Sequence, residues 1–135
     1  MSKAIYVSIN ALAVEKIINK RKNHEFRNYI PKKKFDTLYV YTTSPKSELK
    51  YILKIGQIIK YPDKILVQGD GNPEFNNGQK NKFAYRIDAI YELENSFTLK
   101  ELKECYGFVP PQAFAYGDRY QTLTEKLEQA KKIKK

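Results

Sequence analysis

The sequence predicts an α+β fold, a small mixed β-barrel of five or six strands with a few short helices. Segments at Thr37–Thr42, Glu48–Lys60 and 82–94 are rich in β-branched and aromatic residues, which is typical of strands. Only one early segment, 11–20, carries a well-formed helical stripe. Strands and helices do not alternate regularly, and there is no internal repeat. A mixed barrel is therefore favoured over a parallel sheet with crossover helices.

Chain length and composition indicate one folded unit. A chain of 135 residues buries roughly two thirds of its unfolded surface. A hydrophobic content of 41%, with 13% aromatic residues, is enough to build a core. We expect a domain at 1–118 and a basic helix at 119–135.

Several classes of protein are disfavoured. One cysteine and one histidine leave no intrachain disulfide and make a metal site improbable, and no cofactor is expected. The first residues lack the layout of a signal peptide, and no apolar run reaches the ~20 residues of a membrane span. These features predict a cytoplasmic monomer without membrane contact.

Local patterns place the elements along the chain. After a short strand at 5–8, Asn10 can cap the first helix. Gly56 indicates a bulge in a long strand, and 62–81, rich in Gly, Asn and Pro, is expected to be a loop with little to bury.

The last third of the chain is expected to be helical in two places. Thr98 and Glu101 form a capping box for a short helix that ends at Gly107, with Cys105 on its buried side. A terminal helix is expected at 123–135.

Positive charge is concentrated in two segments. The net charge is +10, of which residues 15–34 carry +6 and residues 126–135 carry +4. Such a localised excess is typical of proteins that bind a polyanion, usually nucleic acid, although solvated lysines are the plain alternative. The residues expected to bind phosphate are Lys16, Lys20, Arg21, Lys32, Lys33 and Lys34.

Two motifs lie at 13–27, which ends in Lys22-Asn23-His24-Glu25-Phe26-Arg27, and at 110–116, Pro-Pro-Gln-Ala-Phe-Ala-Tyr. They resemble the ASCH family of the PUA-like superfamily, whose members have a helix, a Gly-x-Lys turn and a Glu-x-Arg or Thr-x-Arg strand. One ASCH-like subgroup also ends in Pro-Pro-Gln-small-Phe. The resemblance reaches about Tyr116 and implies a PUA-like barrel with a pocket for a nucleobase or nucleotide.

Two positions depart from the family pattern. Lys20 stands where the family usually has glycine, whereas Lys22 matches. The ASCH members known as acetylated-cytidine amidohydrolases carry threonine where this chain has Glu25. That difference counts against the same hydrolysis.

A polar trio, Lys22, Glu25 and Arg27, is the expected centre of the site. On a strand Glu25 and Arg27 point to one side, and His24 points to the other. Together they can offer an acceptor and a forked donor to a base edge. The alternative is a structural ion pair that closes the barrel mouth. We expect one concave site formed by Lys22, Glu25, Arg27, Tyr41, Thr43, Ser44, Gln112 and Phe114.

Three functions remain open. The leading hypothesis is a module that binds RNA, DNA or a modified nucleobase, with a basic rim around a polar pocket. The alternative is an amidohydrolase or ribonuclease in which Lys22 and Glu25 are catalytic. The third hypothesis is a protein-interaction domain whose lysines bind an acidic partner. His24 is expected at the surface, with its pKa lowered by basic neighbours.

Overall fold

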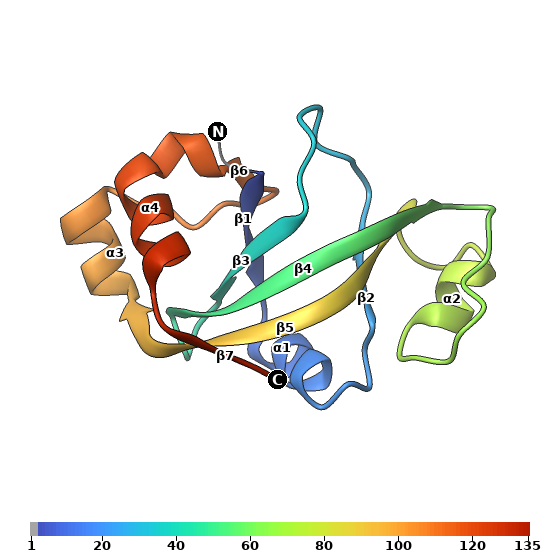
Figure 1. The fold of residues 1–135 in the computed structure, drawn as a ribbon. Helices are drawn as coiled ribbons and strands as arrows, with labels where there is room; N and C mark the ends of the chain where they lie inside the picture. The colour runs from blue at the N-terminus through green and yellow to red at the C-terminus, as the bar shows by residue number, and fades with distance from the viewer. Residues whose placement is uncertain (1–2) are drawn as a thin grey trace.

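One strongly curled, mixed sheet organises the computed structural model, which describes residues 3–135 (Figure 1). The strand order is β2-β5-β4-β3-β1-β6, and β7 pairs with β5 beside β2. Among the strand pairs of these described residues, only β1–β3 is parallel. The strands are β1 (Ala4–Ile9), β2 (His24–Arg27), β3 (Thr37–Thr42), β4 (Glu48–Lys60), β5 (Phe83–Thr98), β6 (Ala115–Tyr116) and β7 (Lys132–Lys134). The helices are α1 (Ala11–Ile18), α2 (Asn72–Asn76), α3 (Leu99–Tyr106), the 3₁₀ turn η1 (Gly117–Tyr120) and α4 (Gln121–Gln129).

This architecture confirms the predicted α+β, barrel-like fold. Within residues 3–135 the sheet has seven strands rather than five or six, because the short strands β6 and β7 add to the segments that sequence patterns indicate. The long strands β4 and β5 pair with one register shift just before Gly56 and another across it, and bulges of this kind increase twist and bend a sheet. The expected bulge is thus present, and it lies where the sheet curls.

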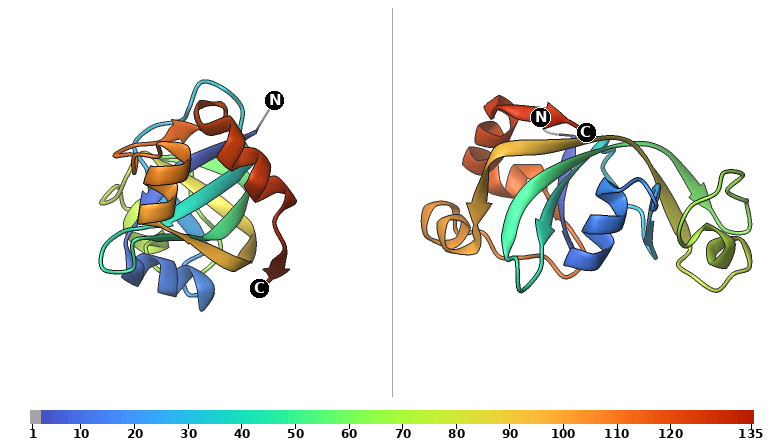
Figure 2. Two further views of the ribbon diagram at one scale, coloured as in Figure 1. Left: turned by 90° about the vertical axis from the view of Figure 1, so that its left-hand side faces the viewer. Right: turned by 90° about the horizontal axis from the view of Figure 1, so that it is seen from below.

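The two faces of the sheet carry separate cores. On one face, α1 packs Val14 and Ile17 against Ile5, Val7 and Val40. The other face is covered by α3 and α4, whose buried residues are Leu102, Leu123, Thr124 and Leu127. Figure 2 shows α1 against the curled sheet, with α3 and α4 gathered at one end and α2 at the other. Tyr6 joins the first strand to the last helix, since its hydroxyl lies 2.8 Å from that of Thr124.

The predicted caps are confirmed. Asn10 accepts a hydrogen bond from the backbone N–H of Ala13 at 2.8 Å. Thr98 and Glu101 form the complete capping box, and Gly107 ends α3 with a φ of 62°. Among residues 3–135, no helix is both long and apolar enough to cross a membrane.

Three expectations are wrong. The segment 62–81 contains α2 and buries Ile65 and Phe75 against Phe26, so it has a small core of its own. Cys105 is exposed, because α3 turns only one residue, Leu102, fully inward. The terminal helix ends at Gln129, and the residues after it form β7 on the edge of β5.

Candidate nucleic-acid interface

The turn after α1 positions the first basic residues. Lys20 follows the C-cap Asn19 and has a φ of 62°, in the left-handed region that favours glycine. The backbone N–H groups of Arg21 and Lys22 both donate to the carbonyl of Lys16, at 3.0 and 3.1 Å. The chain therefore turns as a helix with a terminal glycine does, and a lysine occupies the glycine position.

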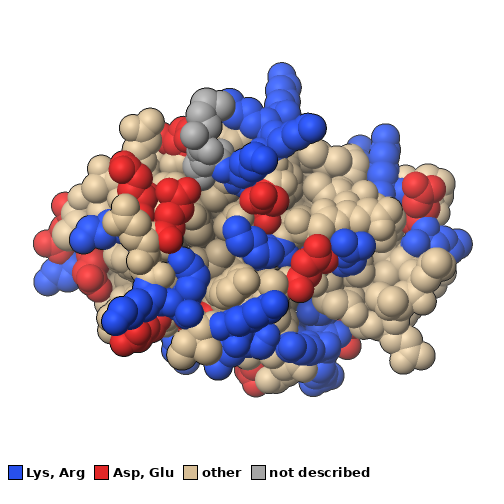
Figure 3. Space-filling model, in the orientation of Figure 1, with Lys and Arg blue, Asp and Glu red and all other residues tan. Residues whose placement is uncertain are grey.

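The second basic segment reaches the same place from the other end of the chain. β7 runs antiparallel to β5, and the N–H of Lys135 donates to the carbonyl of Ile90 at 2.8 Å. Lys20, Lys22, Lys134 and Lys135 consequently line one cleft of about 230 Å³, together with Ile17, Asn23 and β5 residues 87–90. We call it the lysine cleft. Figure 3 shows Lys and Arg side chains gathered on the part of the surface where Figure 1 places α1 and the end of β7.

Charge in the lysine cleft is only partly neutralised. Lys22 pairs with Glu25, and Lys135 lies 3.1 Å from Glu92. Asp88, the acidic residue of the cleft, is held by Arg86 at 2.7 Å. Within the described part of the chain, Lys20 and Lys134 have no ion-pair partner. These two ammonium groups are therefore available to an anion.

The polar trio meets as its spacing predicts. The Glu25 carboxylate lies 2.9 Å from Lys22 Nζ and 2.8 Å from Arg27 Nη2. The contact with Lys22 is an ion pair without hydrogen-bond alignment. Glu25 pairs across the sheet with the buried Tyr85, so its side chain points into the curled sheet. Its side chain is 6% exposed, and a ligand would have to displace an internal cation to reach it.

Arg27 is occupied by the protein itself. Nε donates to Glu25 at 3.0 Å, Nη2 donates to the Ser8 carbonyl at 3.2 Å, and Nη1 donates to the Tyr29 hydroxyl and the Ala113 carbonyl. Burial alone would lower the pKa of Arg27, but the Glu25 carboxylate and Tyr29 outweigh it and raise that pKa. This guanidinium ties β2 to β1 and to the segment before β6.

The other residues expected in the concave site are dispersed. Tyr41 is 4% exposed and packs on Phe108 in the core beneath α3 and α4, because alternation along β3 turns it away from Val40. Ser44 and Gln112 are exposed, and Thr43 is half-buried. Phe114 stacks on Tyr29, with ring centroids 5.3 Å apart, and so lies beside the trio. Phe114 is therefore connected to the trio through Tyr29, whose hydroxyl accepts from Arg27. The described contacts of Tyr41 do not reach the trio.

The residues expected to bind phosphate separate into two groups. Lys16 and Lys20 lie on α1 and its turn, and Arg21 faces Asp70 at 3.7 Å. The loop with Lys32, Lys33 and Lys34 lies on the side of the molecule opposite α1 (Figures 1 and 2). There Lys33 Nζ lies 4.9 Å from the Tyr116 ring centroid. A single anion site cannot use both groups.

No protein-family model and no curated protein sequence matches this chain. Crystal structures of ASCH from Zymomonas mobilis do match, with a TM-score of 0.67 at 18% identity, covering 96% of each chain. Two variants, Ser to Ala and Tyr to Phe, match with TM-scores of 0.66 and 0.67 at 19% and 18% identity; they cover 96% of this chain and 97% and 99% of theirs. This chain has the ASCH fold.

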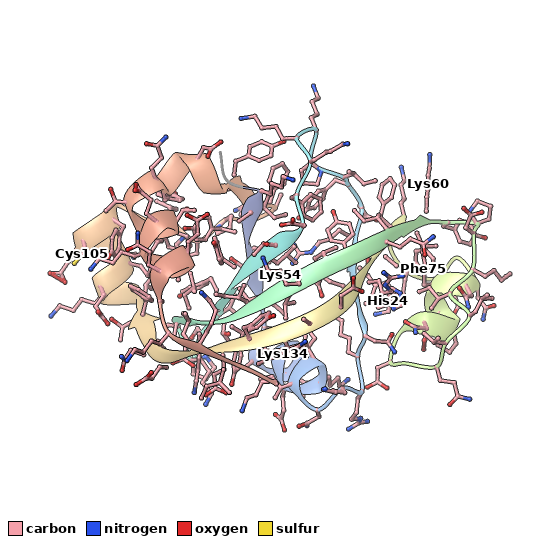
Figure 4. All side chains as sticks on the ribbon, in the orientation of Figure 1. His24, Lys54, Lys60, Phe75, Cys105 and Lys134 are labelled. Carbon is pink, nitrogen blue, oxygen red and sulfur yellow. The ribbon has the colours of Figure 1, made fainter. Side chains whose placement is uncertain are left out.

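His24 occupies an unexpected place in this ASCH fold. It is 1% exposed rather than at the surface, and it lies on β2 beside the α2 segment (Figure 4). Nδ1 lies 2.7 Å from Asn23 Oδ1, which also accepts from Asn72 at 3.0 Å. Burial, with a smaller contribution from Arg86, lowers the pKa of His24 to about 4. The predicted direction was right, but the main cause is burial.

Proposed function

We propose that this chain is a nucleic-acid-binding domain whose lysine cleft holds backbone phosphates. The observation that carries the proposal is the meeting of two remote basic segments in one cleft, with Lys20 and Lys134 unpaired among the described residues. Lysines that neutralise phosphates release condensed counterions, and this release supplies most non-specific affinity. Nothing in the cleft favours RNA over DNA.

In this proposal the polar trio has a structural role and does not read bases. Glu25 and Arg27 satisfy each other and are largely buried, which fits a clasp between strands better than a base reader. The amidohydrolase and ribonuclease alternatives, with Lys22 and Glu25 as catalytic groups, would need a substrate to reach a carboxylate that already faces two cations.

The test compares two double variants of equal charge. Fluorescence anisotropy of labelled single-stranded RNA and DNA is measured from low to moderate salt. Lys20→Ala with Lys134→Ala removes two phosphate contacts, so the slope of log K against log salt should flatten by about 1.4. Lys100→Ala with Lys103→Ala on the exposed face of α3 is the control and should keep the wild-type slope. Equal flattening of the slope in both double variants, or no oligonucleotide binding at low salt, would refute the role of the lysine cleft in binding.

A further inference from the structure

A second hollow lies on the other flank of α1. It has a volume of about 270 Å³ and opens between α1 and the turn that joins β3 to β4. We call it the threonine pocket. Ile17 and Lys20 border the lysine cleft, whereas Ile18 and Asn19 border the threonine pocket, so the end of α1 separates the two. The lining residues are Ala11, Val14, Glu15, Ile18, Asn19, Thr42, Lys46, Glu48, Lys50 and Tyr51.

Thr42 gives the pocket an unsatisfied polar group. Alternation along β3 places its side chain on the same face as Val40, toward α1. The residue is 3% exposed, and its Oγ1 has no hydrogen-bond partner within residues 3–135. The other buried threonines, Thr37 and Thr124, both have bonded hydroxyls. Because an unpaired buried hydroxyl is unfavourable, Thr42 points to a bound partner.

The rim carries charges that the fold leaves free. In the described part of the chain, neither Glu15 nor Glu48 has an ion pair, and Lys46 has none either. Glu48 is half-buried and pairs directly with Thr42 across the β3–β4 register. A hydroxyl and a carboxylate acceptor therefore stand side by side at one wall.

The same sheet wall also carries an aromatic ring, and apolar residues of α1 face it across the pocket. The half-buried ring of Tyr51 lies in the pocket lining with Val14 and Ile18, and Lys50 Nζ is 5.8 Å from its centroid. An aromatic ring beside a cation is a stacking surface for nucleobases. The pocket is smaller than a typical drug-sized site, and its volume suits one base or nucleoside.

We propose that the threonine pocket binds one adenine or cytosine base. The base stacks on Tyr51, Thr42 Oγ1 donates to the ring nitrogen beside the amino group, and the Glu48 carboxylate accepts from the exocyclic amine. Uracil and thymine place a carbonyl oxygen where that amine would be, so Glu48 repels them. The inference rests on the proposed function in one respect, since a strand held in the lysine cleft would deliver the base across the end of α1.

Nucleosides test the pocket without phosphates. Adenosine, cytidine and uridine are titrated into the ¹⁵N-labelled chain, and amide shifts are followed by NMR. Adenosine and cytidine should shift the amides of Ile18, Thr42 and Tyr51, and uridine should bind at least about fivefold more weakly. Thr42→Val should weaken adenosine at least about fivefold, whereas Thr42→Ser, which keeps the hydroxyl, should bind as the wild type. Glu48→Gln should shift preference toward uridine, because its amide can donate to a carbonyl.

Several results would overturn the inference: no saturable shifts at the pocket, equal binding of uridine and adenosine, or wild-type adenosine affinity in Thr42→Val. The two proposals fail separately. Oligonucleotide binding through Lys20 and Lys134 without nucleoside binding refutes the pocket and leaves the lysine cleft standing. Nucleoside binding without oligonucleotide binding supports the pocket and refutes the proposed function.

Discussion

The guanidinium of Arg27 lies 2.8 Å from the carboxylate of Glu25, and the two side chains are only 13% and 6% exposed. A buried ion pair of this kind adds little net stability over apolar packing, yet it becomes very costly when one partner is removed. The pair is therefore most informative when only one member is changed.

Glu25→Gln should lower the free energy of unfolding by about 3–5 kcal/mol, because Lys22 and Arg27 then lose their shared counter-charge. Urea denaturation measures this. Glu125→Gln, at an exposed position on α4, should stay within about 0.5 kcal/mol of the wild type. A Glu25→Gln protein of normal stability that loses base preference would instead make Glu25 a base-reading residue.

Lys20→Gly should raise stability by about 1 kcal/mol, because glycine removes the Cβ strain at a φ of 62°. Thermal denaturation measures the change. Lys20→Ala is the matched control, since it removes the same charge and keeps the Cβ. Both variants should weaken oligonucleotide binding equally. A glycine variant less stable than the alanine variant would contradict the prediction.

His24 should make stability fall as the pH drops from about 6.5 to about 4. The unfolded histidine takes up a proton near pH 6.5, whereas the buried one does so only near pH 4. Its contribution is therefore complete above pH 6.5, falls as the pH drops, and changes no further below pH 4. In His24→Asn, whose Nδ2 can replace the donor to Asn23, urea titrations should show roughly 3 kcal/mol less loss across this range. Equal losses of stability in the wild type and in His24→Asn would show that His24 does not cause this pH dependence.

Lys132 and Lys134 should behave oppositely although only one residue separates them. Lys132 Nζ donates to three carbonyls at the end of α4, at 3.0 to 3.4 Å, so Lys132→Ala should cost about 1 kcal/mol of stability and leave oligonucleotide affinity unchanged. Lys134→Ala should weaken binding and leave the melting temperature unchanged. A binding loss in Lys132→Ala equal to that in Lys134→Ala would contradict this division.

Local patterns could be predicted from the sequence because they depend on near neighbours. The cap at Asn10, the capping box at Thr98 and the bounds of β3 and β4 follow from propensity and spacing. The contact between Glu25 and Arg27 follows from the two-residue period of one strand, and Lys22 reaches Glu25 from the turn before that strand.

The remaining features depend on contacts between distant segments. His24 is buried because the α2 segment folds over β2, and nothing near it in sequence indicates that cover. Phe75 is a core residue, but the Gly, Asn and Pro residues around it in sequence are typical of a loop and give no indication of burial. The lysine cleft exists only because β7 pairs with β5, a contact that no local period encodes.

The place of β7 also determines what the edge of the sheet presents to solvent. Along one edge of β5, β2 covers residues 83–86 and β7 covers residues 91–93. Without β7, the second stretch would expose unpaired N–H and C=O groups to which a strand from another molecule could add. With it, the outermost strand is three residues long and has a lysine at each end, two features that discourage further pairing. The basic sequence at 132–134 thus gives this edge of the sheet a short and charged border in place of an open one.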